Sequence, residues 1–159
     1  MCYSVYISTD SPEDLTKHNS EFVKFDRIAD SEDNPCIGLL EFPHKWYIGS
    51  KAGCSCSFRH LMSVELGFSD PVDWYEEEQD DLDATRELYF ILNELLSKDY
   101  HVDLIDSWHS VQPEDMVTID VSFNDVSSTA FRLFENYKFK LLKKTQQVGP
   151  GDSQGRAIS

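Results

Sequence analysis

The stretch that decides the fold reads Asp80-Asp-Leu-Asp-Ala-Thr-Arg-Glu-Leu-Tyr-Phe-Ile-Leu-Asn-Glu-Leu-Leu-Ser-Lys98. It contains no glycine or proline, and its aliphatic residues recur at the spacing of a helix face. Asp80 or Asp81 can cap its first turn and complement the helix dipole. The stretch therefore predicts one long helix over about residues 80–98. Because residues 88–92 place apolar side chains on more than one face of the helix, we expect this helix to lie buried against a sheet.

Segments of alternating polarity on both sides of this helix predict the strands of that sheet. Residues 2–8 and 116–123 alternate most regularly, with apolar side chains at every second position. Further extended segments are expected over residues 22–28, 36–42, 46–50, 101–108 and 137–141. We expect residues 101–108 and 116–123 to pair as a hairpin. Two short helices are predicted, one starting near Pro12 and one running through Phe131.

The length of the chain, 159 residues, suits one hydrophobic core. The predicted elements define a single α+β domain over residues 1–143, built on a largely antiparallel or mixed sheet of about six to eight strands. Residues 144–159 contain Gly149, Gly151 and Gly155 and show no apolar pattern, so they are predicted to form a flexible tail.

The charge of the chain restricts its partners. Against 14 Lys and Arg stand 29 Asp and Glu, a formal net charge of −15. Such a surface repels phosphate backbones and anionic lipid and attracts basic proteins. No segment approaches the roughly 20 apolar residues of a membrane helix, and the first residues do not read as a signal peptide. The expectation is a cytoplasmic protein that binds neither nucleic acid nor membrane.

An acidic segment over residues 70–83 contains two adjacent aromatic residues. Trp74 and Tyr75 are followed by Glu76, Glu77 and Glu78. Aromatic anchors with a charged rim are typical of hot spots that face a surface of opposite charge. These five residues are the predicted partner-binding site. The alternative is a solvated loop whose aromatic side chains fold back onto the core.

A second candidate site is the segment Ala52-Gly-Cys-Ser-Cys-Ser-Phe-Arg-His60. Two thiolates and one or two imidazoles suit zinc or copper, and the further ligands available to Cys54 and Cys56 are His60, Cys36 and His44. The spacing is shorter than in most structural zinc sites. On a flat strand alternate residues lie about 6.6 Å apart along one face, so the two sulfurs meet at one ion only if the backbone turns, as Gly53 allows, or if both side-chain rotamers converge.

Two other interpretations of this segment remain open. Arg59, Lys51 and His60 could lower a thiol pKa and support redox chemistry, although a Cys-x-Cys disulfide closes a strained ring. Alternatively, Cys54 and Cys56 are small apolar residues of a buried strand. No cofactor is expected unless the segment is a metal site, in which case zinc is the candidate.

No complete catalytic motif occurs among the serine hydrolase, zinc protease and nucleotide-binding signatures. Asp106 and His109 are close in sequence and could form an acid–base pair, but alternate directions along a strand would separate them. The sequence therefore favours a non-enzymatic acidic binding protein of the inhibitor or immunity type, with a basic protein as its partner. The competing hypothesis is a metal-binding or thiol-redox protein centred on Cys54 and Cys56.

Overall fold

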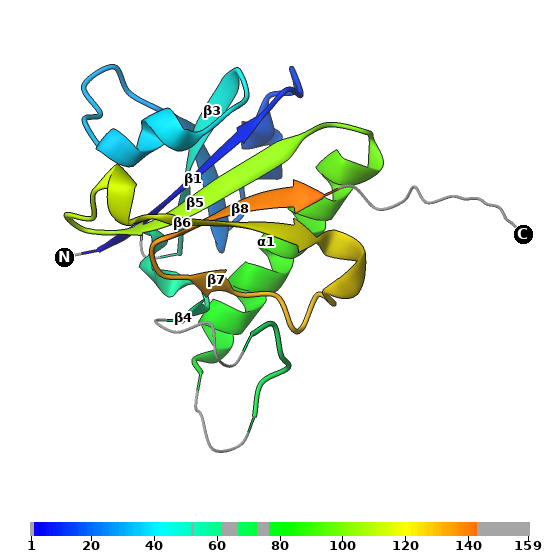
Figure 1. Cartoon of the computed structure of the whole chain (residues 1–159). Helices are drawn as coiled ribbons and strands as arrows, with labels where there is room; N and C mark the ends of the chain where they lie inside the picture. Colours follow the sequence, from blue (N-terminus) through cyan, green and yellow to red (C-terminus); the bar gives the residue numbers. More distant parts are fainter. Residues whose placement is uncertain (1, 52, 62–66, 73–76, 143–159) are drawn as a thin grey trace, which may run out of the picture.

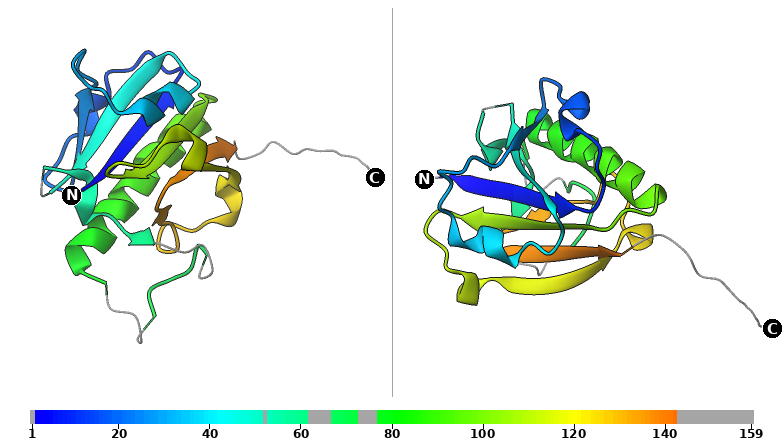
Figure 2. Two further views of the ribbon diagram at one scale, coloured as in Figure 1. Left: turned by 60° about the vertical axis from the view of Figure 1, so that its left-hand side comes forward. Right: turned by 90° about the horizontal axis from the view of Figure 1, so that it is seen from above.

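The fold is a mixed sheet covered on one face by a long helix. The computed structural model describes residues 2–51, 53–61, 67–72 and 77–142. The six-stranded sheet has the order β2-β3-β1-β5-β8-β6, and a separate pair is formed by β4 and β7. Helix α1 lies across one face of the sheet (Figures 1 and 2). The predicted α+β domain with one long helix is confirmed.

The strands have the following bounds: β1 Tyr3–Thr9, β2 Val23–Arg27, β3 His44–Ser50, β4 His60–Leu61, β5 Val102–Trp108, β6 Val117–Ser122, β7 Leu133–Phe134 and β8 Tyr137–Leu142. Strand β1 pairs antiparallel with both β3 and β5, β3 with β2, and β5 with β8. The pairs β6–β8 and β4–β7 are parallel. The sheet is therefore mixed, with β1 and β5 in its interior.

Helix α1 spans Gln79–Ser97, within one residue of the predicted range at each end. The expectation that Asp80 or Asp81 caps the helix is wrong, because the N-cap residue is Glu78, whose side chain makes no capping hydrogen bond. Asp80 and Asp81 lie in the first turn, where carboxylates stabilise the positive end of the dipole. The helix ends where Asp99 adopts a left-handed conformation, with φ of 67°, and Tyr100 N–H donates to Leu95 O at 3.1 Å. Among the described residues, no helix is long and apolar enough to cross a membrane.

Two cores lie on opposite faces of the sheet, because neighbouring residues of a strand point to opposite sides. On the helix side, α1 packs over a cluster that includes Val5, Trp46, Leu104 and Phe139. The smaller core on the other side is made by Tyr6, Cys36, Leu40 and Ile105. The predicted strands over residues 2–8 and 101–108 are confirmed, but both are buried on both faces, and each supplies side chains to both cores.

Three expectations about single elements are wrong. Residues 35–39 form a 3-10 helix rather than a strand, because Asn34 caps it and Pro35 occupies its first turn. Residues 133–134 form strand β7 rather than the end of a helix. Strand β6 pairs with β8 and does not form a hairpin with β5, whose two neighbours in the sheet are β1 and β8.

Candidate functional site

A cluster of three thiols forms where the sheet meets the loop after β3. The Sγ atoms of Cys2, Cys54 and Cys56 all lie within 4.8 Å of one another. Cys2 is exposed, whereas Cys54 and Cys56 are half-buried. All three are free thiols. Cys2 directly precedes β1, and the other two follow β3, so the antiparallel pairing of β1 with β3 brings the two segments together.

The chain reverses between β3 and the two cysteines. Gly53 has φ of 89°, which L side chains rarely adopt, and its N–H donates to Ser50 O at 2.8 Å. Ser50 then donates to Cys54 O through both its backbone N–H, at 2.7 Å, and its hydroxyl, at 2.6 Å. The turn near Gly53 allows the two thiols to converge. Residues 55–57 then form a 3-10 turn rather than a flat strand.

Ser55, between the two cysteines, anchors this turn to the sheet. Its side chain is completely buried. Its hydroxyl donates to Ile48 O of β3 at 2.6 Å and accepts from Val5 N–H of β1 at 2.9 Å. A buried hydroxyl that both donates and accepts a hydrogen bond is costly to displace. The Cys-Ser-Cys turn is thereby fixed beside the start of β1, where Cys2 lies.

His60 supports the same turn from the helix side of the sheet. Its Nε2 lies 2.6 Å from Ser55 O, and its Nδ1 lies 2.7 Å from Asp106 Oδ2. Because a carbonyl oxygen only accepts hydrogen bonds, Nε2 carries a hydrogen and Nδ1 faces the carboxylate. The ring also stacks on Tyr3, the neighbour of Cys2, with centroids 3.8 Å apart and planes at 4°. His60 therefore contacts both segments that carry the thiols without being one of the clustered ligands.

The His60–Asp106 pair is almost fully buried, with side-chain exposures of 4% and 1%. Burial would lower the pKa of His60, but the Asp106 carboxylate and the Ser55 carbonyl raise it above its usual value. Burial raises the pKa of Asp106, and His60 opposes that rise. Asp106 Oδ1 has no hydrogen-bond partner among the described residues. A buried pair of this kind holds its geometry only while both members are present.

The thiols of Cys54 and Cys56 differ in acidity because they bond to each other. Burial would raise the pKa of Cys54, but hydrogen bonds from Cys56 and Cys2 to its sulfur lower it below the usual value. Burial and the hydrogen bond to Cys54 raise the pKa of Cys56 to about 12. Cys54 is therefore the thiol that ionises before Cys56, and a neighbouring S–H stabilises its thiolate.

The structure separates the other ligands proposed from sequence. Cys36 is buried in the smaller core, where its Sγ contacts Val111 O at 3.8 Å. His44 pairs with Thr9 at the far end of β1 from Cys2. His60 uses both ring nitrogens for Asp106 and Ser55. Of the five metal or redox candidates, only Cys54 and Cys56 thus belong to the cluster. The third thiol of the cluster is Cys2, which was not among the predicted ligands.

Asp106 also differs from expectation. It was considered as a partner of His109, but its carboxylate bonds to His60, which is 46 residues away in the chain. His109 instead donates its backbone N–H to Cys2 O at 3.1 Å, just beyond the end of β5. This hydrogen bond fixes the backbone of Cys2 from the side opposite the Cys-Ser-Cys turn.

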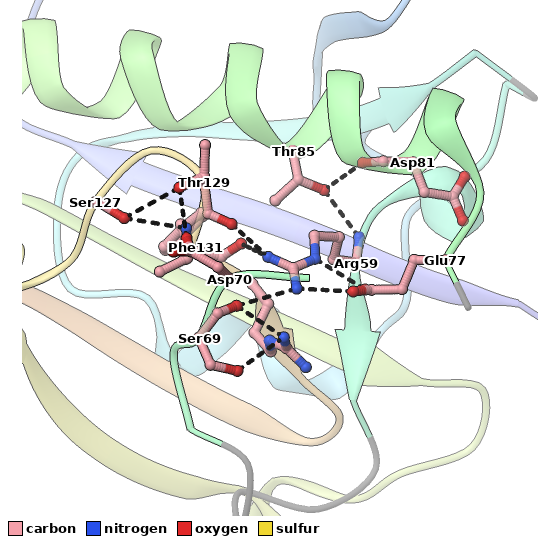
Figure 3. Close-up of polar contacts among 11 residues, drawn as sticks. Arg59, Ser69, Asp70, Glu77, Asp81, Thr85, Ser127, Thr129 and Phe131 are labelled. Carbon is pink, nitrogen blue, oxygen red and sulfur yellow. Dashed lines mark hydrogen bonds and ion pairs between the residues drawn. The ribbon is translucent and has the colours of Figure 1, made fainter. Parts of the chain in front are cut away.

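The predicted partner-binding residues fall partly outside the described residues, since Trp74, Tyr75 and Glu76 are not among those described. Glu77 is bound by the buried guanidinium of Arg59 through two hydrogen bonds of 2.8 Å (Figure 3). Glu78 is exposed and precedes α1 as its N-cap residue. Of the two described glutamates, only Glu78 is therefore placed as a solvent-facing charge.

Arg59 forms a polar centre on the helix side (Figure 3). Besides Glu77, its guanidinium donates to Thr129 O at 2.9 Å, to Phe131 O at 3.1 Å and to Ser69 O at 3.2 Å. Its backbone N–H donates to the hydroxyl of Thr85 on α1 at 2.8 Å. All guanidinium N–H groups are used, so Arg59 holds three loops against the helix and is not available as a ligand-binding cation.

A second group of metal-ligating side chains comprises Glu13, His18 and Glu94, whose nearest donor atoms also lie within 4.8 Å of one another. Lys98 lies 3.2 Å from Glu13 and 3.1 Å from Glu94, and Lys17 lies 2.5 Å from Glu13. These ammonium groups already balance both carboxylates. The thiol cluster consists of three sulfur atoms, which are ligands that zinc prefers, and is the better candidate for a metal centre.

Comparisons of the chain with protein-family models, with curated proteins and with solved structures give no match. The function must therefore be inferred from the chemistry of the thiol cluster and of the residues that support it.

Proposed function

We propose that this protein binds a thiophilic metal ion, with zinc as the candidate, through the thiolates of Cys2, Cys54 and Cys56. The observation that supports this most is the convergence of three sulfurs from two separate segments within 4.8 Å. Thiolates are the preferred ligands of Zn²⁺ and Cu⁺, and neither carboxylate nor imidazole belongs to this group. Hard cations such as Mg²⁺ and Ca²⁺ prefer oxygen donors and are not expected to bind here.

Single cysteine substitutions test the proposal. Changing Cys2, Cys54 or Cys56 to serine should lower zinc affinity by more than about 100-fold, because loss of a ligand costs more than the 10- to 100-fold typical of supporting residues. Cys36→Ser is the matched control and should leave affinity unchanged, since Cys36 lies in the smaller core and is not one of the clustered thiols. Competition with a chromophoric chelator measures each affinity. Zinc binding that is indifferent to Cys2→Ser would refute a three-thiol site.

Metal affinity should fall as pH decreases. A metal ion replaces the thiol protons, and the pKa of Cys56, about 12, keeps that thiol protonated in the metal-free protein at neutral pH. At least one proton is then released per ion, so the logarithm of the affinity constant should rise by about one or more per pH unit between roughly pH 6 and 9. Competition titrations at several pH values provide the slope. An affinity that does not vary with pH would contradict thiolate ligation.

A thiol-redox role is the alternative use of the same residues. The lowered pKa of Cys54 favours it, since the thiolate is the reactive form. A dithiol, however, needs only Cys54 and Cys56 and gives no reason for Cys2 to lie beside them. Mass spectrometry after incubation in a glutathione buffer distinguishes the two roles: a redox protein forms the Cys54–Cys56 disulfide reversibly, whereas a metal site resists oxidation while zinc is bound.

The charge of −15 supports a second proposal, that the acidic segment engages a basic protein partner. The test is affinity capture at low and high salt with the wild type and with a Glu76→Gln/Glu78→Gln variant. Glu77 is left intact because it binds Arg59. Basic proteins captured at low salt should be lost at about 1 M salt, where the screening length is only about 3 Å, and by the variant. Undiminished capture of the same partner by the variant would rule this proposal out.

A further inference from the structure

A polar cavity of about 410 Å³ lies beside the thiol cluster, with Cys2 among its lining residues. Its volume is in the range of small-molecule sites. Ser4 and Tyr6 of β1 and Ser107 of β5 line it on the face of the sheet opposite α1, and two turns over residues 32–35 and 109–112 complete it. Cys2, one of the proposed metal ligands, thus lines a cavity large enough to hold a small molecule.

The walls of the cavity are held by hydrogen bonds. Asn34 accepts from Cys36 N–H at 2.9 Å and donates to the Ser107 hydroxyl at 3.3 Å, which ties the first turn to β5. The backbone bond from His109 to Cys2 holds the second turn to the start of β1. The cavity is therefore formed before any ligand arrives, which reduces the ordering cost of binding.

The charge of the lining selects between classes of ligand. Glu32 and Asp33 contribute carboxylates, and no Lys or Arg is among the described residues that line the cavity. Burial and the Glu32 carboxylate raise the pKa of Tyr6 to about 12, so this hydroxyl stays neutral near physiological pH. The lining therefore disfavours anions.

The thiol cluster leaves a coordination position for such a ligand. It contains three sulfurs, and no fourth Cys, His, Asp or Glu atom joins it in the part of the chain that the structure describes. Zinc takes four ligands, and sites with three protein ligands bind a fourth from outside. Cys2 is the most exposed of the three cysteines and the one that lines the cavity. The cavity therefore adjoins the cluster at Cys2.

We infer that the cavity binds a small ligand with a neutral nitrogen donor, which completes the coordination of the metal held by the three cysteines. This inference rests on the proposed function. It assigns the protein an open metal site with a built-in preference for amines and imidazoles over anionic donors.

Imidazole, which is largely neutral at about pH 8, and azide, an anion, are suitable probes on Co²⁺-loaded protein, whose visible spectrum reports the ligands of the metal. We expect imidazole to change the spectrum at concentrations about tenfold or more below those that azide needs, since the carboxylates repel the anion. A Glu32→Gln/Asp33→Asn variant should reduce this preference. Ser4→Leu, which fills the cavity without removing a thiol, should abolish the imidazole effect while Co²⁺ stays bound.

The outcomes separate this inference from the proposed function. If Co²⁺ and Zn²⁺ fail to bind at all, the proposed function itself is wrong. If Co²⁺ binds through the thiols but imidazole has no effect, or acts equally on Ser4→Leu, the cavity does not serve the metal. If imidazole acts only after His109→Ala, His109 already fills the fourth position and the site is closed. Equal responses to azide and imidazole would overturn the charge preference.

Discussion

Replacing His60 with phenylalanine is expected to weaken metal binding by about 10- to 100-fold, the usual cost of losing a residue that orients metal ligands. Phenylalanine keeps the ring that stacks on Tyr3 but cannot donate to Ser55 O or pair with Asp106. The turn that carries Cys54 and Cys56 then loses one of its anchors. The same change leaves Asp106 buried without its partner, which should also destabilise the fold by about 3–5 kcal/mol.

Two measurements separate the loss of positioning from the loss of stability. Chemical denaturation of the metal-free protein gives the stability change, and alkylation followed by mass spectrometry counts the thiols that zinc protects in the folded fraction. In the wild type three thiols should be protected, and in His60→Phe fewer. His60→Gln, which retains a donor for the Ser55 carbonyl, should restore part of the protection. Full protection of three thiols at wild-type affinity in His60→Phe would show that His60 does not position the cluster.

Replacing Arg59 with methionine is expected to cost about 3–5 kcal/mol of stability, as for other buried ion pairs that lose one partner. Arg59 and Glu77 have side-chain exposures of 2% and 11%, and methionine retains the apolar stem but none of the donors to three carbonyl groups. For a chain of this length the melting temperature should fall by an amount on the order of 10 °C. Differential scanning calorimetry measures the change.

A double substitution serves as the internal control for this prediction. In Arg59→Met/Glu77→Met no charge is left unpaired, so the variant should be more stable than Arg59→Met alone. Lys51→Met breaks an exposed pair with Asp80 and should change the melting temperature little. If Arg59→Met melts like the wild type, Arg59 does not hold the loops together. If the double variant is the less stable one, the unpaired charge of Glu77 is not the cause of the loss.

The long helix and most strands could be predicted because their patterns are local. Helix α1 has acidic residues in its first turn, apolar residues at helical spacing and a left-handed residue, Asp99, just after its end. In β1 apolar and more polar residues alternate along the sequence. Residues 36–40 are all apolar or glycine, a pattern that is compatible with more than one structure, and the cap at Asn34 with Pro35 in the first turn favours a 3-10 helix. The parallel pairing of β6 with β8 depends on the order of strands in the sheet, which no local pattern contains.

The candidate site could be predicted only in part for a related reason. Cys54, Cys56 and the turn at Gly53 are neighbours in sequence, so their grouping was visible. Cys2 is 52 residues before Cys54, and only the pairing of β1 with β3 makes it their neighbour. The His60–Asp106 pair likewise joins β4 to β5 across 46 residues. Such contacts are properties of the topology rather than of a motif.

The most direct test of the three-thiol site is X-ray absorption spectroscopy of the zinc-loaded protein, which counts the sulfur atoms bound to the metal. We predict three sulfur neighbours at about 2.3 Å and one lighter nitrogen or oxygen neighbour at about 2.0 Å. In Cys2→Ser the sulfur count should fall to two. A wild-type spectrum with two or fewer sulfur neighbours, or with only nitrogen and oxygen, would contradict the assignment of Cys2, Cys54 and Cys56 as a metal site.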